Sequence, residues 1–276
     1  MATSNGQDGC GHAKDNKLAG GGSHWITWDA QWVRNMPDPT RIFTSTVLGT
    51  IVFKYLIENE WNLQFVIFGF FLNPYVLFSF AVSIGVAFHA GFTWKSFYAL
   101  PVYDRWAVEW YFWNAALYHM IMDGFTGTFG VVPLVLYQYQ QLDFRFISHH
   151  SVPWLVGLVE LFVHAPFCLL SMWAILKNHP LRYPMELITG VLHIFGMVMF
   201  IGAEIYEGQL NVPSKDPVGI SGNMWANVKF NDFYQFTYYW FGFWFCNLVW
   251  LFVPYVRMVR AVDEICRKFA EGSKRE

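Results

Sequence analysis

Two pairs of histidine and carboxylate side chains lie in apolar stretches of the sequence. His119 and Asp123 are four residues apart, and Glu160 and His164 repeat that spacing. On a helix, residues four apart share one face. An ionisable group within a membrane helix costs several kcal/mol unless it is paired or faces a cavity, so it is a functional candidate by default. We therefore take these four residues as candidate catalytic groups.

The chemistry open to these pairs is the delivery of a proton to a weak base. A carboxylic acid in an apolar pocket can hold a proton and pass it to an alkene or an epoxide oxygen, and a nearby imidazole can relay it. The product is a carbocation, which water would quench. A dry pocket lined by aromatic rings excludes water and stabilises the cation.

Aromatic residues make up 20% of the chain, more than membrane helices require. Interface anchoring and packing account for most of them, and we expect the remainder to line the pocket. The rings in position to do so are Trp113, Tyr118, Trp154, Trp173, Tyr238, Tyr239, Trp240, Trp244 and Trp250. The polar residues His193 and Asn247 also lie in apolar segments. Such residues often form hydrogen bonds between helices, so both have a structural interpretation beside a functional one.

The segments that must position these residues are long and apolar. Of 276 residues, 55% are hydrophobic and 14% are charged, against roughly 25% charged in an average soluble domain. Five segments are long enough to cross about 30 Å of hydrocarbon: 63–92, 106–128, 152–176, 184–205 and 233–256. Lipid offers backbone groups no hydrogen-bond partners, so we expect helices. The predicted fold is an all-α polytopic membrane bundle of five transmembrane helices.

The regions outside these spans define the expected domains. Residues 1–41 form a glycine-rich polar tail without an apolar signal region, expected to be disordered. Residues 42–62 include an apolar stretch of 16 residues with Lys54, which is expected to be an interfacial helix or a short sixth span. Residues 63–262 form the membrane domain, and residues 263–276 form a charged tail. Lysines and arginines gather in the loops 93–105 and 177–183 and in this tail, which places the C-terminus in the cytosol.

Composition excludes several other functions. The net charge of −2 leaves no basic surface for nucleic acid. The four cysteines form no CxxC pair. His149 and His150 resemble part of a membrane di-iron histidine cluster, but the repeated HxxxH and HxxHH boxes that such a cluster needs do not occur. We therefore expect neither a metal nor a cofactor.

Four motifs resemble the emopamil-binding protein family, whose shared region is the EXPERA domain. They are Tyr118-His119-Met120-Ile121-Met122-Asp123-Gly124, Asp143-Phe144-Arg145-Phe146, His179-Pro180-Leu181-Arg182-Tyr183, and Asn247-Leu248-Val249-Trp250 followed by Pro254. The resemblance covers roughly residues 74–262. It implies a five-helix bundle in the endoplasmic reticulum membrane, a sterol-sized cavity, and sterol isomerisation by protonation followed by proton loss or hydride shift. By the same resemblance His119 and Asp123 protonate the substrate, while Asn247 and Trp250 line the cavity and stabilise the cation.

Two departures from the family pattern suggest a different substrate. The second-span acid is glutamate in the isomerases and Asp123 here, one methylene shorter. The third-span glutamate of the family falls on Gly157, and Glu160 follows one helical turn later. An unchanged sterol alkene would not tolerate that shift of the acid–base pair.

We therefore expect a divergent enzyme that cyclises a terpenoid or meroterpenoid epoxide. Asp123 and His119 would serve as the acid, and Glu160 and His164 as the base or cation stabiliser. The residues expected to bind substrate are Trp113, Tyr118, His193, Tyr239, Asn247 and Trp250. The alternatives are a Δ8–Δ7 sterol isomerase and a non-catalytic protein that binds sterol or lipid. The expected partners are an isoprenoid or sterol and the lipid bilayer, with a homodimer as an open option.

Overall fold

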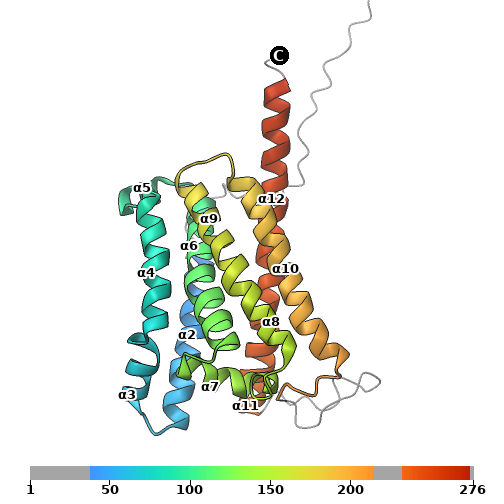
Figure 1. Ribbon diagram of the computed structural model, residues 1–276. Helices are drawn as coiled ribbons and strands as arrows, with labels where there is room; N and C mark the ends of the chain where they lie inside the picture. Colours follow the sequence, from blue (N-terminus) through green and yellow to red (C-terminus); the bar gives the residue numbers. More distant parts are fainter. Residues whose placement is uncertain (1–37, 214–231, 274–276) are drawn as a thin grey trace, which may run out of the picture.

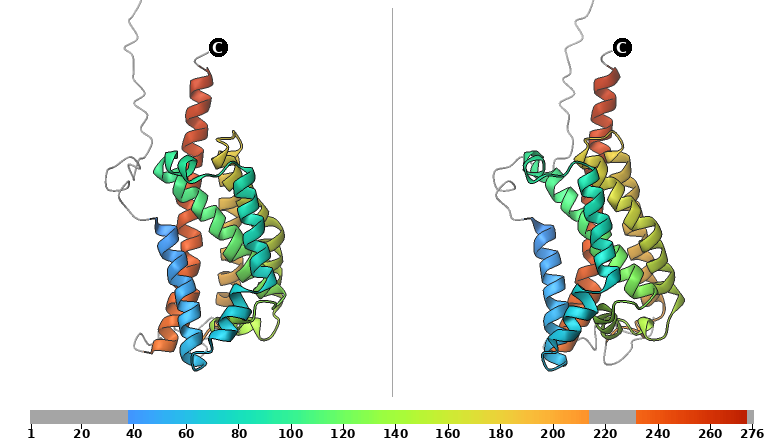
Figure 2. Two further views of the ribbon diagram at one scale, coloured as in Figure 1. Left: turned by 90° about the vertical axis from the view of Figure 1, so that its left-hand side faces the viewer. Right: turned by 60° about the vertical axis from the view of Figure 1, so that its left-hand side comes forward.

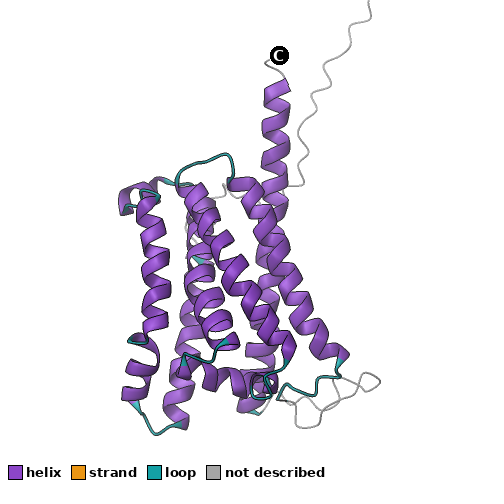
Figure 3. Ribbon diagram, in the orientation of Figure 1, coloured by secondary structure: helices purple, strands orange, loops and turns teal. Residues whose placement is uncertain are grey.

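The computed structural model describes residues 38–213 and 232–273, and these residues form helices joined by short loops, without a strand (Figures 1 and 3). The helices are α2 (Pro39–Glu58), α3 (Leu63–Val66), η1 (Ile67–Phe71), α4 (Pro74–His89), α5 (Trp94–Ala99), α6 (Val102–Trp113), η2 (Asn114–Thr128), α7 (Pro133–Leu142), η3 (Phe144–Phe146), α8 (Ser151–Val159), η4 (Glu160–His164), α9 (Ala165–Leu176), α10 (Arg182–Tyr206), α11 (Phe233–Gln235), η5 (Phe236–Cys246) and α12 (Asn247–Ser273). The all-α fold is confirmed.

The five expected spans correspond to five helical units in the described part of the chain. Three are unbroken helices long and apolar enough to cross a membrane: Ser151–Leu176, Arg182–Tyr206 and Phe233–Ser273. The other two are bent pairs, Leu63–Phe71 with Pro74–His89 at 47° and Val102–Thr128 with Pro133–Leu142 at 78°. The sharper bend follows Gly130, whose φ of +67° suits glycine, and precedes Pro133. As a result α7 crosses one end of the bundle (Figure 1).

The helix α2 begins within the expected polar tail (1–41) and covers most of the short apolar segment expected before residue 63 (42–62). It begins at Pro39, three residues earlier than expected, because Asp38 accepts a hydrogen bond from the Thr40 amide and proline suits the first helical position. It runs upright beside the fifth span in both views of Figure 2. Its placement as an interfacial helix or a short sixth span stays a prediction. The helix is not among those whose length and hydropathy suffice for a span. Residues 1–37 of the expected tail lie outside the described residues.

The charged C-terminal tail is helical as far as Ser273. From residue 263 to Ser273 the chain continues α12 as one helix, which extends past the other helices at the end of the bundle that carries α5 and the α9–α10 loop (Figure 1). The basic segments used to orient the chain therefore gather at a single end. The cytosolic location of that end stays a prediction.

Wide π-type turns interrupt three of the spans where the candidate residues lie. His119 and Asp123 are in η2, Glu160 and His164 are in η4, and η5 ends at Cys246, directly before Asn247. Such turns hydrogen-bond five residues apart rather than four, and they are frequent at functional sites. They change which side chains share a face of the helix.

Candidate active site

A cavity of about 180 Å³ lies among η2, α7, α8, α10 and the fifth span. A single water needs roughly 10–15 Å³ of such space, so the cavity can take an organic molecule. Its walls are mostly apolar and aromatic. The candidate residues in its lining are Tyr118, His119, Asp123, Glu160, His193, Asn247 and Trp250.

Asp123 is the most accessible carboxylate of the site, with 34% of its side chain exposed. The Tyr139 hydroxyl donates a hydrogen bond of 2.8 Å to Asp123 Oδ1. Asp123 Oδ2 lies 3.9 Å from His119 Nδ1, beyond hydrogen-bond distance. A proton on Oδ2 is therefore free to leave toward a bound molecule while Tyr139 holds the other oxygen.

Glu160 lies between two imidazoles. Glu160 Oε2 is 2.6 Å from His119 Nδ1 and 2.5 Å from His164 Nδ1. Because an ionised carboxylate only accepts hydrogen bonds, both Nδ1 atoms carry hydrogen when Glu160 is charged. His164 is 1% exposed and does not line the cavity, so it supports Glu160 from behind. The expected Glu160–His164 pair is present, and the closest carboxylate to His119 is Glu160 rather than Asp123.

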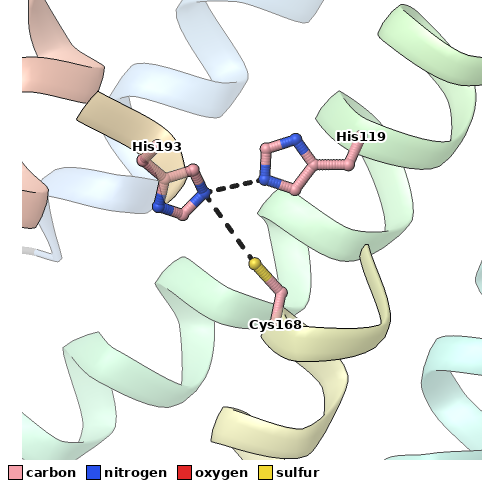
Figure 4. Close-up of side chains that lie close together, drawn as sticks. All are labelled: His119, Cys168 and His193. Atoms are coloured by element: carbon pink, nitrogen blue, oxygen red, sulfur yellow. Dashed lines mark hydrogen bonds between the residues drawn. The ribbon is translucent and has the colours of Figure 1, made fainter. Parts of the chain in front are cut away.

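His193 extends this group from α10. Its Nε2 lies 2.8 Å from His119 Nε2 and 3.9 Å from Cys168 Sγ (Figure 4). One of the two facing nitrogens must donate and the other accept. A proton can therefore sit on either ring, and His119 can exchange protons with Glu160 on one side and His193 on the other.

Close backbone packing fixes the positions of the two carboxylates. A Cβ atom at Gly157 would lie 2.4 Å from the Asp123 carbonyl oxygen, and one at Gly124 would lie 2.7 Å from Leu161 Cβ. Only glycine allows η2 to approach α8 (at Gly157) and η4 (at Gly124) this closely. A glutamate at position 157, where the motif resemblance implies one, would not fit this crossing. The next turn of the helix supplies Glu160 instead.

The fifth span contributes an aromatic wall. Trp250 Nε1 donates a hydrogen bond of 2.7 Å to Asn114 Oδ1, and its ring meets Tyr118 edge-on at 4.7 Å between centroids. Asn247 Nδ2 donates to the Phe243 carbonyl at 2.6 Å. Trp250 and Tyr118 therefore present fixed ring faces to the cavity.

Two residues expected to bind substrate do not line this cavity. Trp113 packs against Phe80 and Phe112, and the Tyr239 hydroxyl donates to Gln209 Oε1 at 2.7 Å. Trp113 is the last residue of α6, and Tyr239 lies within η5. We therefore withdraw Trp113 and Tyr239 from the site.

Other lining residues were missed by the sequence analysis. Tyr139 and Gln138 lie on α7, and Val47, Thr50 and Ile51 lie on α2. The aspartate-to-tyrosine contact spans 16 residues across a 78° bend, so no periodic pattern could indicate it. The 3.6-residue pattern of α2 could have indicated a buried face.

Two sets of residues in the described chain could hold a metal ion: His119, Glu160 and His164, and His119, Cys168 and His193. Ligand atoms around a tetrahedral zinc ion lie roughly 3.3 Å apart, given metal–nitrogen bonds near 2.0 Å. Three contacts within these sets are shorter: Glu160 Oε2 lies 2.5 Å from His164 Nδ1 and 2.6 Å from His119 Nδ1, and the Nε2 atoms of His119 and His193 are 2.8 Å apart. That spacing is typical of shared protons. His149 and His150 lie at the start of α8, outside the cavity lining, and His150 caps that helix.

The motif around Arg145 is structural. Arg145 is fully buried, forms an ion pair of 2.7 Å with Asp143 and lies 3.3 Å from Glu204. It ties the loop after α7 to the end of α10, and so holds Phe146 in the cavity wall.

Comparison with known proteins gives a family match and two relatives. Residues 135–261 match the family model EBP, described as EXPERA (EXPanded EBP superfamily). This match begins after His119 and Asp123, later than the motif resemblance.

Both relatives are named 3-beta-hydroxysteroid-Delta(8),Delta(7)-isomerase. The protein of Mus musculus is 25% identical over 128 residues, which cover 46% of this chain and 47% of the relative. The protein of Cavia porcellus is 21% identical over 173 residues, which cover 60% of this chain and 67% of the relative. The chain thus spans about half the length of the mouse relative. The motifs, the matched residues and the two relatives agree in showing a distant similarity of this chain to the EBP family.

Proposed function

We propose that this protein is a membrane enzyme that isomerises or cyclises an isoprenoid through a protonated, carbocationic intermediate. The observation that supports it is a pair of carboxylates, Asp123 and Glu160, facing a mostly apolar cavity with only histidine and tyrosine as polar partners. Neither partner is a permanent cation, so protons can enter and leave the pair.

The reaction gives up one proton and takes one back, so it needs no cofactor. Asp123 donates the proton on Oδ2 to the substrate, and the cation forms against the rings of Trp250 and Tyr118. Glu160 then accepts a proton from a neighbouring carbon as the final double bond forms. His119 touches Glu160 and faces Asp123, so it returns the proton once the 3.9 Å gap closes or a water bridges it. The product is an isomer of the substrate.

The substrate we favour is a terpenoid or meroterpenoid epoxide. Protonation of the epoxide oxygen opens the ring to a tertiary cation, and attack by an internal alkene forms a carbocycle. Two features of position 157 support this choice. The residue there is a glycine, where the motif resemblance implies a glutamate, and η2 crosses α8 too closely at this point for a larger side chain. The base is then Glu160, one turn further along the helix. A sterol Δ8-alkene is the second candidate, favoured by the names of the two relatives.

Product analysis tests both candidates. Membranes containing the full chain are incubated with a terminal prenyl epoxide and with a Δ8-sterol, and products are identified by mass spectrometry and NMR. We expect conversion of the epoxide, and a loss of about 10²–10⁴-fold in Asp123→Asn, the usual range for removing a general acid. Conversion of the sterol alone would favour the isomerase. If Asp123→Asn retains full turnover of either compound, the acid assignment is wrong.

A further inference from the structure

We propose that the cavity contains a second polar subsite, centred on the Gln138 side-chain amide, which binds an oxygen atom at the polar end of the isoprenoid. The inference rests on the proposed function for the chemical class of the ligand. The subsite itself rests on the geometry of Gln138 and Tyr238, neither of which takes part in the proton chemistry.

In the side-chain amide of Gln138 the oxygen has a hydrogen-bond partner and the nitrogen has none among the described residues. Its Oε1 accepts a hydrogen bond of 2.8 Å from the Tyr238 hydroxyl. Its Nε2 is buried and meets no hydrogen-bond partner among the described residues. The residue is 5% exposed and lines the cavity. Buried amide donors are rarely left unpaired, so this one points to an acceptor that the protein itself does not supply.

Tyr238 fixes the direction of the open end. Its side chain is 4% exposed, and its hydroxyl is bonded to Gln138 Oε1, with Glu58 Oε2 3.5 Å away. With Oε1 held, the donor edge of the amide is the part left for a ligand. An ether, hydroxyl or carbonyl oxygen accepts such a bond, whereas a hydrocarbon end does not.

The subsite and the acid lie on different walls joined by one helix. Gln138 and Tyr139 are neighbours on α7, where successive side chains point about 100° apart. Tyr139 contacts Asp123 on η2, whereas Gln138 contacts Tyr238 on η5. A ligand that places its oxygen at Gln138 therefore presents a different part of its skeleton to Asp123. The subsite sets which end of the molecule is protonated.

Paired probes separate this subsite from general packing. The first pair is cholest-8-en-3β-ol and its 3-deoxy analogue, and the second is farnesol 10,11-epoxide and the epoxide lacking the hydroxyl. Dissociation constants are measured by quenching of tryptophan fluorescence with the full chain in nanodiscs. The variants are Gln138→Met, Tyr238→Phe and, as a matched control on the same helix outside the cavity, Gln140→Met.

We expect Gln138→Met to weaken binding of a hydroxyl probe by about 3- to 10-fold, the range of one hydrogen bond, and to leave its deoxy partner unchanged. Tyr238→Phe should give a smaller loss, about 2-fold, with the same selectivity, because it only loosens the amide. Gln140→Met should match the wild type. Equal effects of Gln138→Met on both members of each pair, or no effect, would overturn the subsite, since the donor would then meet water or pack structurally.

Turnover in the same preparations separates this proposal from the proposed function. If Asp123→Asn abolishes turnover while Gln138→Met weakens binding of both members of each probe pair equally, or of neither, the function stands and the subsite fails. An oxygen-selective loss in Gln138→Met with full turnover in Asp123→Asn supports the subsite and contradicts the acid. If none of the four probes binds the wild type, both proposals fail.

Discussion

We call Asp123, Glu160 and their partners His119, His164, His193 and Tyr139 the acid cluster. The helices that carry this cluster, or run directly into it, also carry a second set of buried charges two to four turns away, and the two sets differ in their partners. On α6 and η2 the sets are represented by Asp104 and His119, and on α10 by Glu186 and His193. Seven residues of helix rise about 10 Å, so Glu186 and His193 lie on one face of α10 at different depths. Asp104 lies in the first turn of α6, and Arg182 is the first residue of α10.

Arginines neutralise every carboxylate of that second set. Arg182 pairs with Asp104 at 2.5 Å and Arg257 pairs with Glu186 at 3.0 Å. Arg257 also donates to the Tyr111 hydroxyl at 3.3 Å. None of these five residues lines the cavity. In the acid cluster, by contrast, the partners of Asp123 and Glu160 are histidines and a tyrosine.

The partner of a buried carboxylate determines whether the carboxylate can take part in proton transfer. Arginine stays charged in proteins, so its carboxylate partner stays ionised and acts as a structural anchor. Histidine and tyrosine exchange protons with their partners. Burial of a carboxylate in an apolar bundle therefore does not identify a catalytic acid unless its partner is also known.

The largest expected effect is on turnover, in a matched pair of glutamates. Glu160→Gln should lower turnover by about 10²–10⁴-fold, because the amide cannot accept the proton that ends the reaction. Glu186→Gln should leave the turnover of the folded protein within about 3-fold of the wild type, since it faces no substrate. Product formation per folded molecule, with folding followed by thermal unfolding in detergent, measures both. Equal losses of turnover in the two variants would contradict the assignment of Glu160 to catalysis and of Glu186 to structure.

The next largest effect is on the free energy of unfolding, in the second set of buried charges. Arg257→Met leaves Glu186 buried without its cation, which should cost about 3–5 kcal/mol of unfolding free energy. Replacing both members, as Arg257→Met with Glu186→Leu, should recover much of that loss, because an apolar pair needs no compensation. Denaturation in mixed micelles measures the two variants. A double variant no more stable than Arg257→Met alone would show that the pair is not the anchor.

The length of the apolar segments predicted the spans, and i, i+4 spacing predicted the pairs His119–Asp123 and Glu160–His164, but neither predicted the contacts between the two pairs. The i, i+4 rule linked His119 to Asp123, yet their side chains are 3.9 Å apart, while His119 lies 2.6 Å from Glu160 on another helix. Residues four apart stack in α-helical turns, and η2 has wider ones. Contacts between helices depend on crossing points, which local spacing does not specify.

The same limit explains Tyr139 and the two misplaced aromatics. Tyr139 reaches Asp123 only because the chain bends by 78° before α7. Trp113 ends α6 and packs on Phe80 and Phe112, and Tyr239 in η5 bonds to Gln209, so neither lines the cavity. Both contacts are to other elements or to ring neighbours that a periodic pattern does not specify. By contrast, Trp250 was predicted from the motif it shares with the family, and it does line the cavity.

A smaller effect is expected at the crossing that sets the spacing of the acid cluster. Gly157→Ala introduces a Cβ atom 2.3 Å from Thr128 Oγ1 and 2.4 Å from the Asp123 carbonyl oxygen. The helices must separate, which should cost about 1–3 kcal/mol of stability and lower turnover by moving Asp123 away from Glu160. Gly202→Ala is the control, because a Cβ there meets no atom within 4 Å. Turnover and melting temperature unchanged in Gly157→Ala would contradict the tight crossing.

The smallest effect tests how Tyr139 directs the proton of Asp123. Tyr139→Phe removes the hydrogen bond to Oδ1 and leaves the ring in place. Either oxygen of Asp123 can then carry the proton, so we expect turnover to fall by about 3- to 10-fold, the equivalent of one hydrogen bond, with little change in substrate affinity. The Tyr238 hydroxyl is the matched comparison, because it bonds to Gln138 and not to an acid, so Tyr238→Phe should change affinity rather than turnover. Steady-state kinetics on the two variants distinguishes the roles. If Tyr139→Phe changes only affinity, Tyr139 shapes the cavity and does not orient the acid.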